Sequence, residues 1–355
     1  MNTNPFISFI LPNYNNEHVL NLFFEKFIIN NTYNNYEFII VDDGSEDCSL
    51  EVLYDWKNSG KIKNMLIIEE PHLGIINALN KALFLSKGEF IIRCDGDATI
   101  ETQSFVERFL EFYYINPEKI GVITSKVIAD NGWLHALGRS IISSKGLLDR
   151  GKIPTETIGF RTWDYKTEIS SNFDNIVNKP AEIDTALGVF TFFRRDIALK
   201  IGGFDKNYPL WIEDDDFFLM FRLYNKKCFY LPNIEICHRF SLRGNRNPDS
   251  WRKRYFNFIK TIDDEVRLIR SYYLFGRIKI FERKYISWRP KILLHNYNYW
   301  KQKWGFDCLN PNMEDIKRLY KDTEILWNYD IKLKNEGEQI INEYIKTKSI
   351  STFQL

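Results

Sequence analysis

The chain has 355 residues, of which 44% are hydrophobic and 16% aromatic, which is enough apolar material for one large core or two ordinary ones. Its formal net charge of +1 excludes an acidic disordered chain and argues against a nucleic-acid partner. The five cysteines are widely spaced, with no CxxC pair and no zinc-like grouping, so we expect reduced thiols and a cytoplasmic location. No run approaches the roughly 18 to 20 apolar residues of a membrane span, so any membrane contact is expected to be peripheral.

The first 125 residues alternate short apolar runs with longer amphipathic segments. Runs rich in Ile, Val or Phe predict buried strands at 6–11, 36–41, 64–69, 89–94 and 120–125. Helices are expected between them at about 17–30, 46–58, 75–86 and 102–116, with Ser45 or Ser49 and Thr102 as N-caps. This alternation predicts an α/β fold, a Rossmann-like mostly parallel sheet with helices on both faces.

Polar clusters follow three of the predicted strands: "PNYNNE" (12–17), "DDGS" (42–45) and "DGD" (95–97). A lone Asp-Gly is more often a turn than a binding site. Ligands of such sheets bind outside the carboxyl ends of the strands, however, and all three clusters fall there. Together they indicate one ligand site at this edge.

The second half of the chain is less regular. Residues 126–180 are rich in Gly, Ser, Asn and Trp without a clear period, and we interpret them as a variable, substrate-facing region. Residues 182–205 predict a strand, a short helix and a Gly-Gly turn. A helix is expected just after the acidic run 213–216. The helix macrodipole favours acids at that end, which accounts for one or two of the four.

The segment after His238 is expected to be mostly helical, because apolar residues between Trp251 and Tyr273 recur at spacings of three and four. Residues 243–291 contain 14 Lys or Arg against 5 Asp or Glu. One interpretation is docking on an anionic membrane that carries a lipid-linked acceptor. The alternative is a homo-oligomer interface or an ordinary solvated face.

Six stretches, taken together, resemble the large inverting glycosyltransferase family 2, which has the GT-A fold. They are "ILPNYNNE", "IIVDDGSED", "GIINALNKAL", "GEFIIRCDGDAT", "RRDIALKIGGFD" and "WIEDDDFFLMFRL". The resemblance covers about residues 5 to 240. It implies a GT-A domain at 1–240, with 126–180 as its variable acceptor-side region, and a mainly helical C-terminal extension at 241–355.

The resemblance implies transfer of a sugar from a nucleotide-sugar, most simply a UDP-sugar, to an acceptor hydroxyl in a surface polysaccharide or related glycan. The leaving diphosphate accumulates negative charge, which Mn²⁺ or Mg²⁺ on carboxylate ligands stabilises as a Lewis acid. By resemblance Asp97 binds this metal, and Asp95 contacts the ribose or the metal shell. His238 is expected as a third metal ligand or diphosphate contact, with a structural histidine as the alternative. Arg243 and Arg246 are weaker candidates for the diphosphate.

The acceptor hydroxyl must lose a proton, for which a carboxylate general base is the usual solution. In the family the base is the Asp of an "ED" pair that opens a helix, which here is Glu213-Asp214. Three aspartates follow the glutamate, so Asp215 and Asp216 stay as alternatives. Crowded carboxylates raise one another's pKa, which suits a base that works near neutral pH.

The first two loops are expected to bind the nucleotide. By resemblance Pro12 and Tyr14 line the base pocket, Glu17 and Asp43 hold the ribose or uracil, and Asp42 supports the loop. The alternative for 42–45 is a strand-ending turn with a helix cap.

The helix start "GIINALN" keeps Gly74, Ala78 and Asn80, the last near the diphosphate. Many members of the family have Arg at the position of Leu79, so one phosphate contact is missing and another cation has to take its place.

The QxxRW motif and membrane helices of processive members are absent, so transfer of one or a few sugars is expected. Residues 300–307, "WKQKWGFD", resemble a tail of some non-processive members. Three other classes stay open: a nucleotide-sugar hydrolase, a nucleotidyltransferase, and a non-catalytic glycan-binding module. A nucleotidyltransferase normally has a Gly-rich basic loop after the first strand, which "PNYNNE" is not.

Overall fold

The computed structural model describes residues 4–130, 134–136, 178–209, 212–239 and 289–305. Its strands are β1 (Ile7–Asn13), β2 (Tyr36–Asp43), β3 (Met65–Glu70), β4 (Phe90–Cys94), β5 (Ala98–Ile100), β6 (Ile120–Ala129), β7 (Leu134–Ala136), β8 (Ala181–Ile183), β9 (Phe190–Arg194) and β10 (Lys227–His238). Its helices are α1 (Glu17–Asn30), α2 (Ser49–Asn58), α3 (Ile75–Leu85), α4 (Phe105–Ile115), α6 (Arg195–Lys200), α7 (Glu213–Met220), the 3₁₀ helix η2 (Phe221–Tyr224) and α11 (Arg289–Trp304).

The strands form one sheet in the order β3-β2-β1-β4-β9-β6-β10-β5, with β7 beside β6 and β8 beside β10. The first four strands in this order pair in parallel, as expected. Strand β9 then enters antiparallel between β4 and β6, so the sheet is mixed. Strand β5 turns back from the end of β4 and pairs antiparallel with the end of β10.

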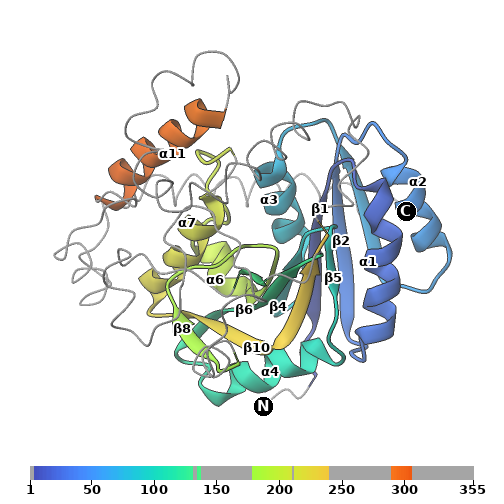
Figure 1. The fold of residues 1–355 in the computed structure, drawn as a ribbon, viewed down its shortest axis with the longest axis horizontal. Helices are drawn as coiled ribbons and strands as arrows, with labels where there is room; N and C mark the ends of the chain where they lie inside the picture. Colours follow the sequence, from blue (N-terminus) through green and yellow to red (C-terminus); the bar gives the residue numbers. More distant parts are fainter. Residues whose placement is uncertain (1–3, 131–133, 137–177, 210–211, 240–288, 306–355) are drawn as a thin grey trace, which may run out of the picture.

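Each face of the sheet has its own core, because successive strand residues point to opposite sides. In β1, Phe9 packs in the core under α1, α2 and α4, whereas Ile10 packs in the core under α3, α6 and α7. Helices therefore cover both faces of the sheet (Figure 1). The fold is therefore of the α/β class that the alternation of apolar runs and amphipathic segments predicts.

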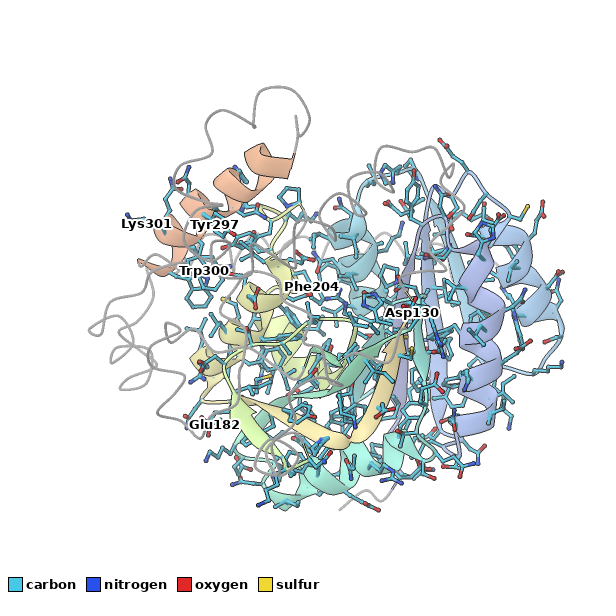
Figure 2. All side chains as sticks on the ribbon, viewed as in Figure 1. Asp130, Glu182, Phe204, Tyr297, Trp300 and Lys301 are labelled. Carbon is cyan, nitrogen blue, oxygen red and sulfur yellow. The ribbon has the colours of Figure 1, made fainter. Side chains whose placement is uncertain are left out.

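Helix α11 packs on the same face of the sheet as α7 (Figure 1), although 68 residues lie between the end of α7 and the start of α11 in the chain. Trp300 and Trp304 are buried among the residues of the core under α3, α6 and α7. Figure 2 shows Trp300 and the exposed Lys301 on this helix. The part of the predicted C-terminal extension 241–355 that the structure describes, residues 289–305, is thus packed against the helix-covered face of the sheet.

The structure differs from the expected helix ends. Helix α2 begins after Cys48 and α4 after Ser104, neither with a side-chain cap, so the predicted caps Ser45, Ser49 and Thr102 are wrong. Their side chains form other hydrogen bonds. The Ser45 hydroxyl donates to Asp42, the Ser49 hydroxyl accepts from the backbone N–H of Asn16, and the Thr102 hydroxyl accepts from the backbone N–H of Glu235. Helix α7 includes the acidic run as its first turn instead of following it.

Most of the variable region 126–180 and the basic segment 243–291, with Arg243 and Arg246, lies outside the described residues. Among the described helices none combines the length and apolar character needed to cross a bilayer.

Candidate active site

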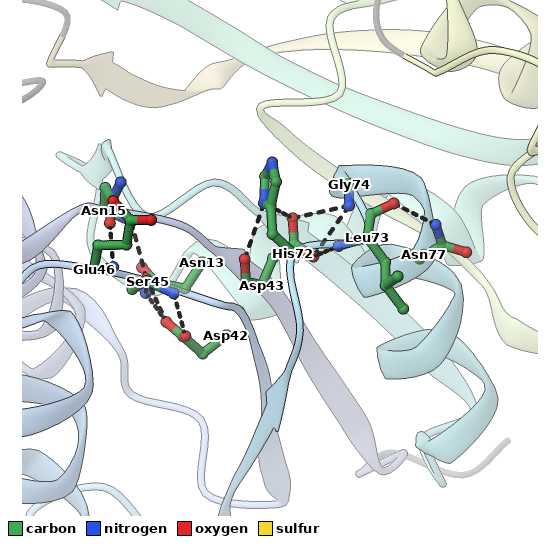
Figure 3. Close-up of polar contacts among 10 residues, drawn as sticks. All are labelled: Asn13, Asn15, Asp42, Asp43, Ser45, Glu46, His72, Leu73, Gly74 and Asn77. Carbon is green, nitrogen blue, oxygen red and sulfur yellow. Dashed lines mark hydrogen bonds and ion pairs between the residues drawn. The ribbon is translucent and has the colours of Figure 1, made fainter.

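The loops after β1 and β2 are joined through Asp42. The parallel register places Asn13 beside Asp42, and Asn13 donates a 2.7 Å hydrogen bond to its carboxylate. The backbone N–H and the hydroxyl of Ser45 donate to the same carboxylate at 2.9 and 2.6 Å (Figure 3). With its oxygens occupied by these donors, Asp42 fixes the shape of both loops.

Asp43 holds the loop after β3 against the end of β2. Its carboxylate accepts hydrogen bonds from the backbone N–H groups of Leu73 at 2.7 Å and Gly74 at 3.0 Å (Figure 3). His72 Nδ1 lies 2.8 Å from Asp43 Oδ2. The His72 ring stacks on the Tyr14 ring, with centroids 4.3 Å apart. The His72 side chain is 59% exposed, so Tyr14 and His72 form an aromatic pair at the carboxyl edge of the sheet.

Asp97 and His238 come together because β5 pairs with the end of β10. The register sets Ala98 opposite His238, and Asp97 Oδ1 lies 3.3 Å from His238 Nε2. Both side chains are buried. Within the described part of the chain, no group of three or more His, Cys, Asp or Glu side chains is arranged to hold a metal ion. A cation at Asp97 and His238 would therefore take its remaining ligands from elsewhere, such as a diphosphate.

Asp95 lies beside Arg93. Its Oδ1 lies 3.5 Å from Arg93, and among the described residues it accepts no hydrogen bond. Burial raises the pKa of Asp95 to about 6, while the Arg93 charge opposes the rise. Asp95 and Asp97 are predicted to act together, but their protein contacts differ.

Arg93 also contacts the proposed base. Its guanidinium forms an ion pair with Asp214, and the backbone N–H of Gly188 donates a 2.8 Å hydrogen bond to the other Asp214 oxygen. Arg93 is buried at 2% exposure, whereas the Asp214 side chain is 14% exposed. This ion pair links strand β4 to the first turn of α7.

The four acids at the start of α7 have different surroundings. Asp215 is fully buried and accepts a 2.6 Å hydrogen bond from the Thr185 hydroxyl. Asp216, also buried, lies 2.7 Å from Lys303 Nζ and accepts a 2.7 Å hydrogen bond from the Trp304 indole. The carboxylates of Asp215 and Asp216 are therefore bound by other side chains of the protein. Asp214 alone among the three aspartates retains appreciable exposure.

Glu213 is buried beside Asp214. Burial raises the pKa of Glu213 to about 8; repulsion from Asp214 adds to the rise and Arg93 opposes it. Glu213 is thus protonated and uncharged near neutral pH, so it does not repel the carboxylate of Asp214. The residue before it, Ile212, has a φ of 67°, a left-handed conformation that is strained for a β-branched side chain.

Two predicted donor-site residues have side chains engaged elsewhere. Asn80 makes two 2.7 Å hydrogen bonds with the backbone of Phe204, which tie α3 to the Gly-Gly turn. Glu17 accepts a 2.8 Å hydrogen bond from the Cys48 N–H at the start of α2. Pro12 lies within buried β1, and Leu79 is fully buried in the core. The predicted contacts of Pro12, Glu17 and Asn80 with a nucleotide stay predictions.

Some residues of this site were not anticipated. Arg93 sits inside an apolar strand, and an Arg in "FIIRC" between buried neighbours is the signal that would have indicated it. His72 lies in a loop with no motif of its own. Lys303 and Trp304 are far from Asp216 in the chain, so only the fold reveals their contact.

Comparison with solved structures identifies the class. The fold is similar to that of GalNAc-T7 in complex with UDP, GalNAc and Mn²⁺, with a TM-score of 0.51 and 13% sequence identity over 74% of this chain and 50% of that one. This is the GT-A arrangement of glycosyltransferases. The model of glycosyl transferase family 2 matches residues 8–202, more than half of the chain, and the chain belongs to this family.

Two curated proteins are similar to part of the chain. It is 33% identical over 108 residues to an uncharacterized glycosyltransferase of Haemophilus influenzae, covering 30% of this chain and 32% of that protein. It is 27% identical over 199 residues to the poly-beta-1,6-N-acetyl-D-glucosamine synthase of Staphylococcus epidermidis, covering 56% of this chain and 42% of the synthase. The chain thus spans less than half the length of either relative.

Proposed function

We propose that the protein is a metal-dependent, inverting glycosyltransferase that moves a sugar from a nucleotide-sugar, most simply a UDP-sugar, to a hydroxyl of a surface polysaccharide or related glycan. The observation that carries the proposal is the contact of one buried cation, Arg93, with Asp214 on α7 and Asp95 after β4. Inverting transfer needs a general base near the acceptor hydroxyl and a site that binds the nucleotide of the donor. Arg93 holds a carboxylate of each, Asp214 for the acceptor and Asp95 for the donor, close to one another.

Asp214 is the base of this proposal. Its side chain is 14% exposed, whereas Asp215 and Asp216 are buried and hydrogen-bonded to other parts of the chain. An acceptor can therefore reach Asp214 more readily than the other two. Asp214 accepts the proton of the attacking hydroxyl. Protonated Glu213 next to it removes a charge that would otherwise repel Asp214.

The donor is held by the loops after β1, β2 and β4. Tyr14 and His72 offer an aromatic surface for the nucleobase, and Asp42 and Asp43 fix the loops that carry them. Asp97 and His238 are the residues that would hold Mn²⁺ or Mg²⁺, because a carboxylate and an imidazole, both suitable metal ligands, lie 3.3 Å apart there. The bound donor would supply further ligands. When bound, the cation neutralises charge on the leaving diphosphate.

The names of similar proteins support this substrate class. The relative from Staphylococcus epidermidis is a polysaccharide synthase, and another, from Bacillus spizizenii, is a poly(ribitol-phosphate) beta-glucosyltransferase that is 34% identical over 122 residues. GalNAc-T7 was solved with UDP and Mn²⁺. We further propose a cytoplasmic enzyme, in which the basic segment 243–291 contacts the membrane.

A nucleotide-sugar screen tests the proposal. The protein is incubated with UDP- and GDP-linked sugars, with Mn²⁺ or with EDTA, in the presence and absence of bacterial glycan acceptors. We expect metal-dependent release of the nucleoside diphosphate that rises with acceptor and yields glycosylated product. Release of free sugar that is independent of acceptor would instead indicate a hydrolase, and binding to glycan without any nucleotide release would indicate a non-catalytic module.

A further inference from the structure

Arg93 is the buried charge that joins the two halves of the candidate site. It projects from β4 two residues before Asp95, and its side chain is 2% exposed. One guanidinium nitrogen pairs with Asp214, and the other lies 3.5 Å from Asp95 Oδ1. The guanidinium carbon lies 5.3 Å from the ring centroid of Phe204, within the range of a cation–π contact.

Gly188 leaves space for this arrangement. Its N–H donates to Asp214, and a Cβ at position 188 would overlap both the Arg93 guanidinium and the Asp214 carboxylate. The segment between β8 and β9 therefore approaches the ion pair as closely as a backbone can. Asp214 is held from two directions, by a cation and by a backbone donor.

We propose that Arg93 is a positioning residue for transfer, which fixes the proposed base Asp214 relative to Asp95 on the donor side. This inference rests on the proposed function. Two nearby carboxylates repel each other, and a planar guanidinium with several donors can hold both in a defined geometry, which a lysine ammonium cannot do equally well. Since Arg93 is buried, it acts through these carboxylates and not by touching the donor or the acceptor.

A purely structural ion pair is the competing explanation. Arg194, which has similar contacts but is 28% exposed, provides a control away from the site. Arg194 on β9 also contacts two carboxylates, Asp196 at 2.8 Å and Glu89 at 3.3 Å, and it lies 5.5 Å from the ring centroid of Phe90. It sits opposite Phe90, at the other end of β4 from Arg93. Replacing Arg194 therefore removes a similar set of contacts away from the site.

The test compares Arg93→Met, Arg93→Lys and Arg194→Met with the wild type. Turnover is measured as UDP release from the UDP-sugar that the wild type uses, and binding as the affinity for UDP with Mn²⁺. We expect Arg93→Met to lower kcat at least thirtyfold relative to the wild type, with the affinity for UDP changed by no more than threefold. Arg93→Lys should recover part of the lost kcat. Arg194→Met should keep kcat within threefold of the wild type. Equal effects of Arg93→Met and Arg194→Met on kcat would overturn the proposal.

Two further variants keep the test decisive. In an Asp214→Asn background, Arg93→Met should lower the residual turnover by no more than twofold, because its partner is already disabled; a full additional loss contradicts positioning through Asp214. If Arg93→Met does not fold, Gly188→Ala displaces the same pair without changing its chemistry, and unchanged kcat in that variant rejects the inference. Wild-type protein inactive with every nucleotide-sugar would instead refute the proposed function itself.

Discussion

The indole N–H of Trp304 donates a 2.7 Å hydrogen bond to Asp216, 88 residues earlier in the chain. Lys303, the preceding residue of α11, lies 2.7 Å from the other oxygen of Asp216 and 2.8 Å from Asp205. Burial raises the pKa of Asp216 to about 6 against the opposing charge of Lys303. Helix α11 is thus anchored to the turn before α7 and to α7 itself, the helix that presents Asp214.

The three aspartates of α7 should respond differently to substitution. Asp214→Asn removes the proposed proton acceptor, so we expect at least a hundredfold lower kcat while the protein still binds UDP with Mn²⁺. It also breaks the ion pair with buried Arg93, so its melting temperature should fall as well. Asp215→Asn and Asp216→Asn disturb buried hydrogen bonds, so they should lower the melting temperature with a much smaller loss of kcat. Steady-state kinetics and thermal unfolding of all three variants measure this. A hundredfold loss confined to Asp215→Asn or Asp216→Asn would move the base to that residue.

Replacing Lys303 by Met should destabilise the protein strongly. The change leaves the buried Asp216 and the partly buried Asp205 without their cation. Removing one partner of a buried ion pair typically costs roughly 3 to 5 kcal/mol. Urea unfolding measures the loss, and Lys301→Met, an exposed lysine on the same helix, is the control and should change stability by less than about 0.5 kcal/mol. Similar midpoints for the two variants would mean that α11 is not anchored at Asp216.

Glu213 should make stability depend on pH. Its pKa is raised to about 8 from an ordinary value of 4.5, chiefly by burial, with Asp214 and Asp215 adding to the rise and Arg93 opposing it. Between these values the folded protein binds a proton that the unfolded chain releases, so stability falls as pH rises through this window. Glu213→Gln mimics the protonated form. We expect the variant to lose less melting temperature than the wild type between pH 5 and pH 8.5.

The comparison with wild type isolates the effect of Glu213. The pKa values of Asp95 and Asp216 are also raised, to about 6, but they lower the stability with rising pH in both proteins alike. Parallel pH profiles for the two proteins would show that Glu213 ionises normally.

Asp43 should affect donor affinity more than turnover. Its carboxylate binds the Leu73 and Gly74 N–H groups at the start of α3 and keeps His72 beside Tyr14. Asp43→Asn replaces one acceptor oxygen by a donor, so the loop should detach and the affinity for UDP with Mn²⁺ should fall about tenfold, with kcat within threefold. Calorimetry measures the affinity. Glu46→Gln on the same loop is the control, since its side chain is exposed. An unaltered affinity of Asp43→Asn would remove this loop from the donor site.

The sequence predicted the strands well, for a physical reason. β1, β2, β4 and β6 are buried on both faces, and their Ile, Val and Phe runs show it directly. The antiparallel entry of β9 was not predictable, because "FTFF" reads as a buried strand in either direction. Helix starts were misplaced because the side chains that looked like caps bind neighbouring loops instead.

The site was predictable only where its residues are local in sequence. "DDGS" and "DGD" indicated loops at the carboxyl edge, and both lie there. The choice among Asp214, Asp215 and Asp216 needed the fold, because successive helix residues point in different directions and their partners Gly188, Thr185 and Lys303 come from other elements. Arg93 needed it as well, since Asp214 is 121 residues away.

The central claim is that two acidic groups divide the work, with Asp97 on the donor side and Asp214 on the acceptor side. One paired measurement on Asp97→Asn and Asp214→Asn tests it: the affinity for UDP with and without Mn²⁺, and the rate of sugar transfer. We predict that both variants lose at least a hundredfold in transfer, that Asp97→Asn loses the Mn²⁺-dependent part of UDP binding, and that Asp214→Asn keeps it. Full sugar transfer by either variant would contradict the account. So would the reverse binding result, in which Asp214→Asn loses Mn²⁺-dependent UDP binding and Asp97→Asn retains it.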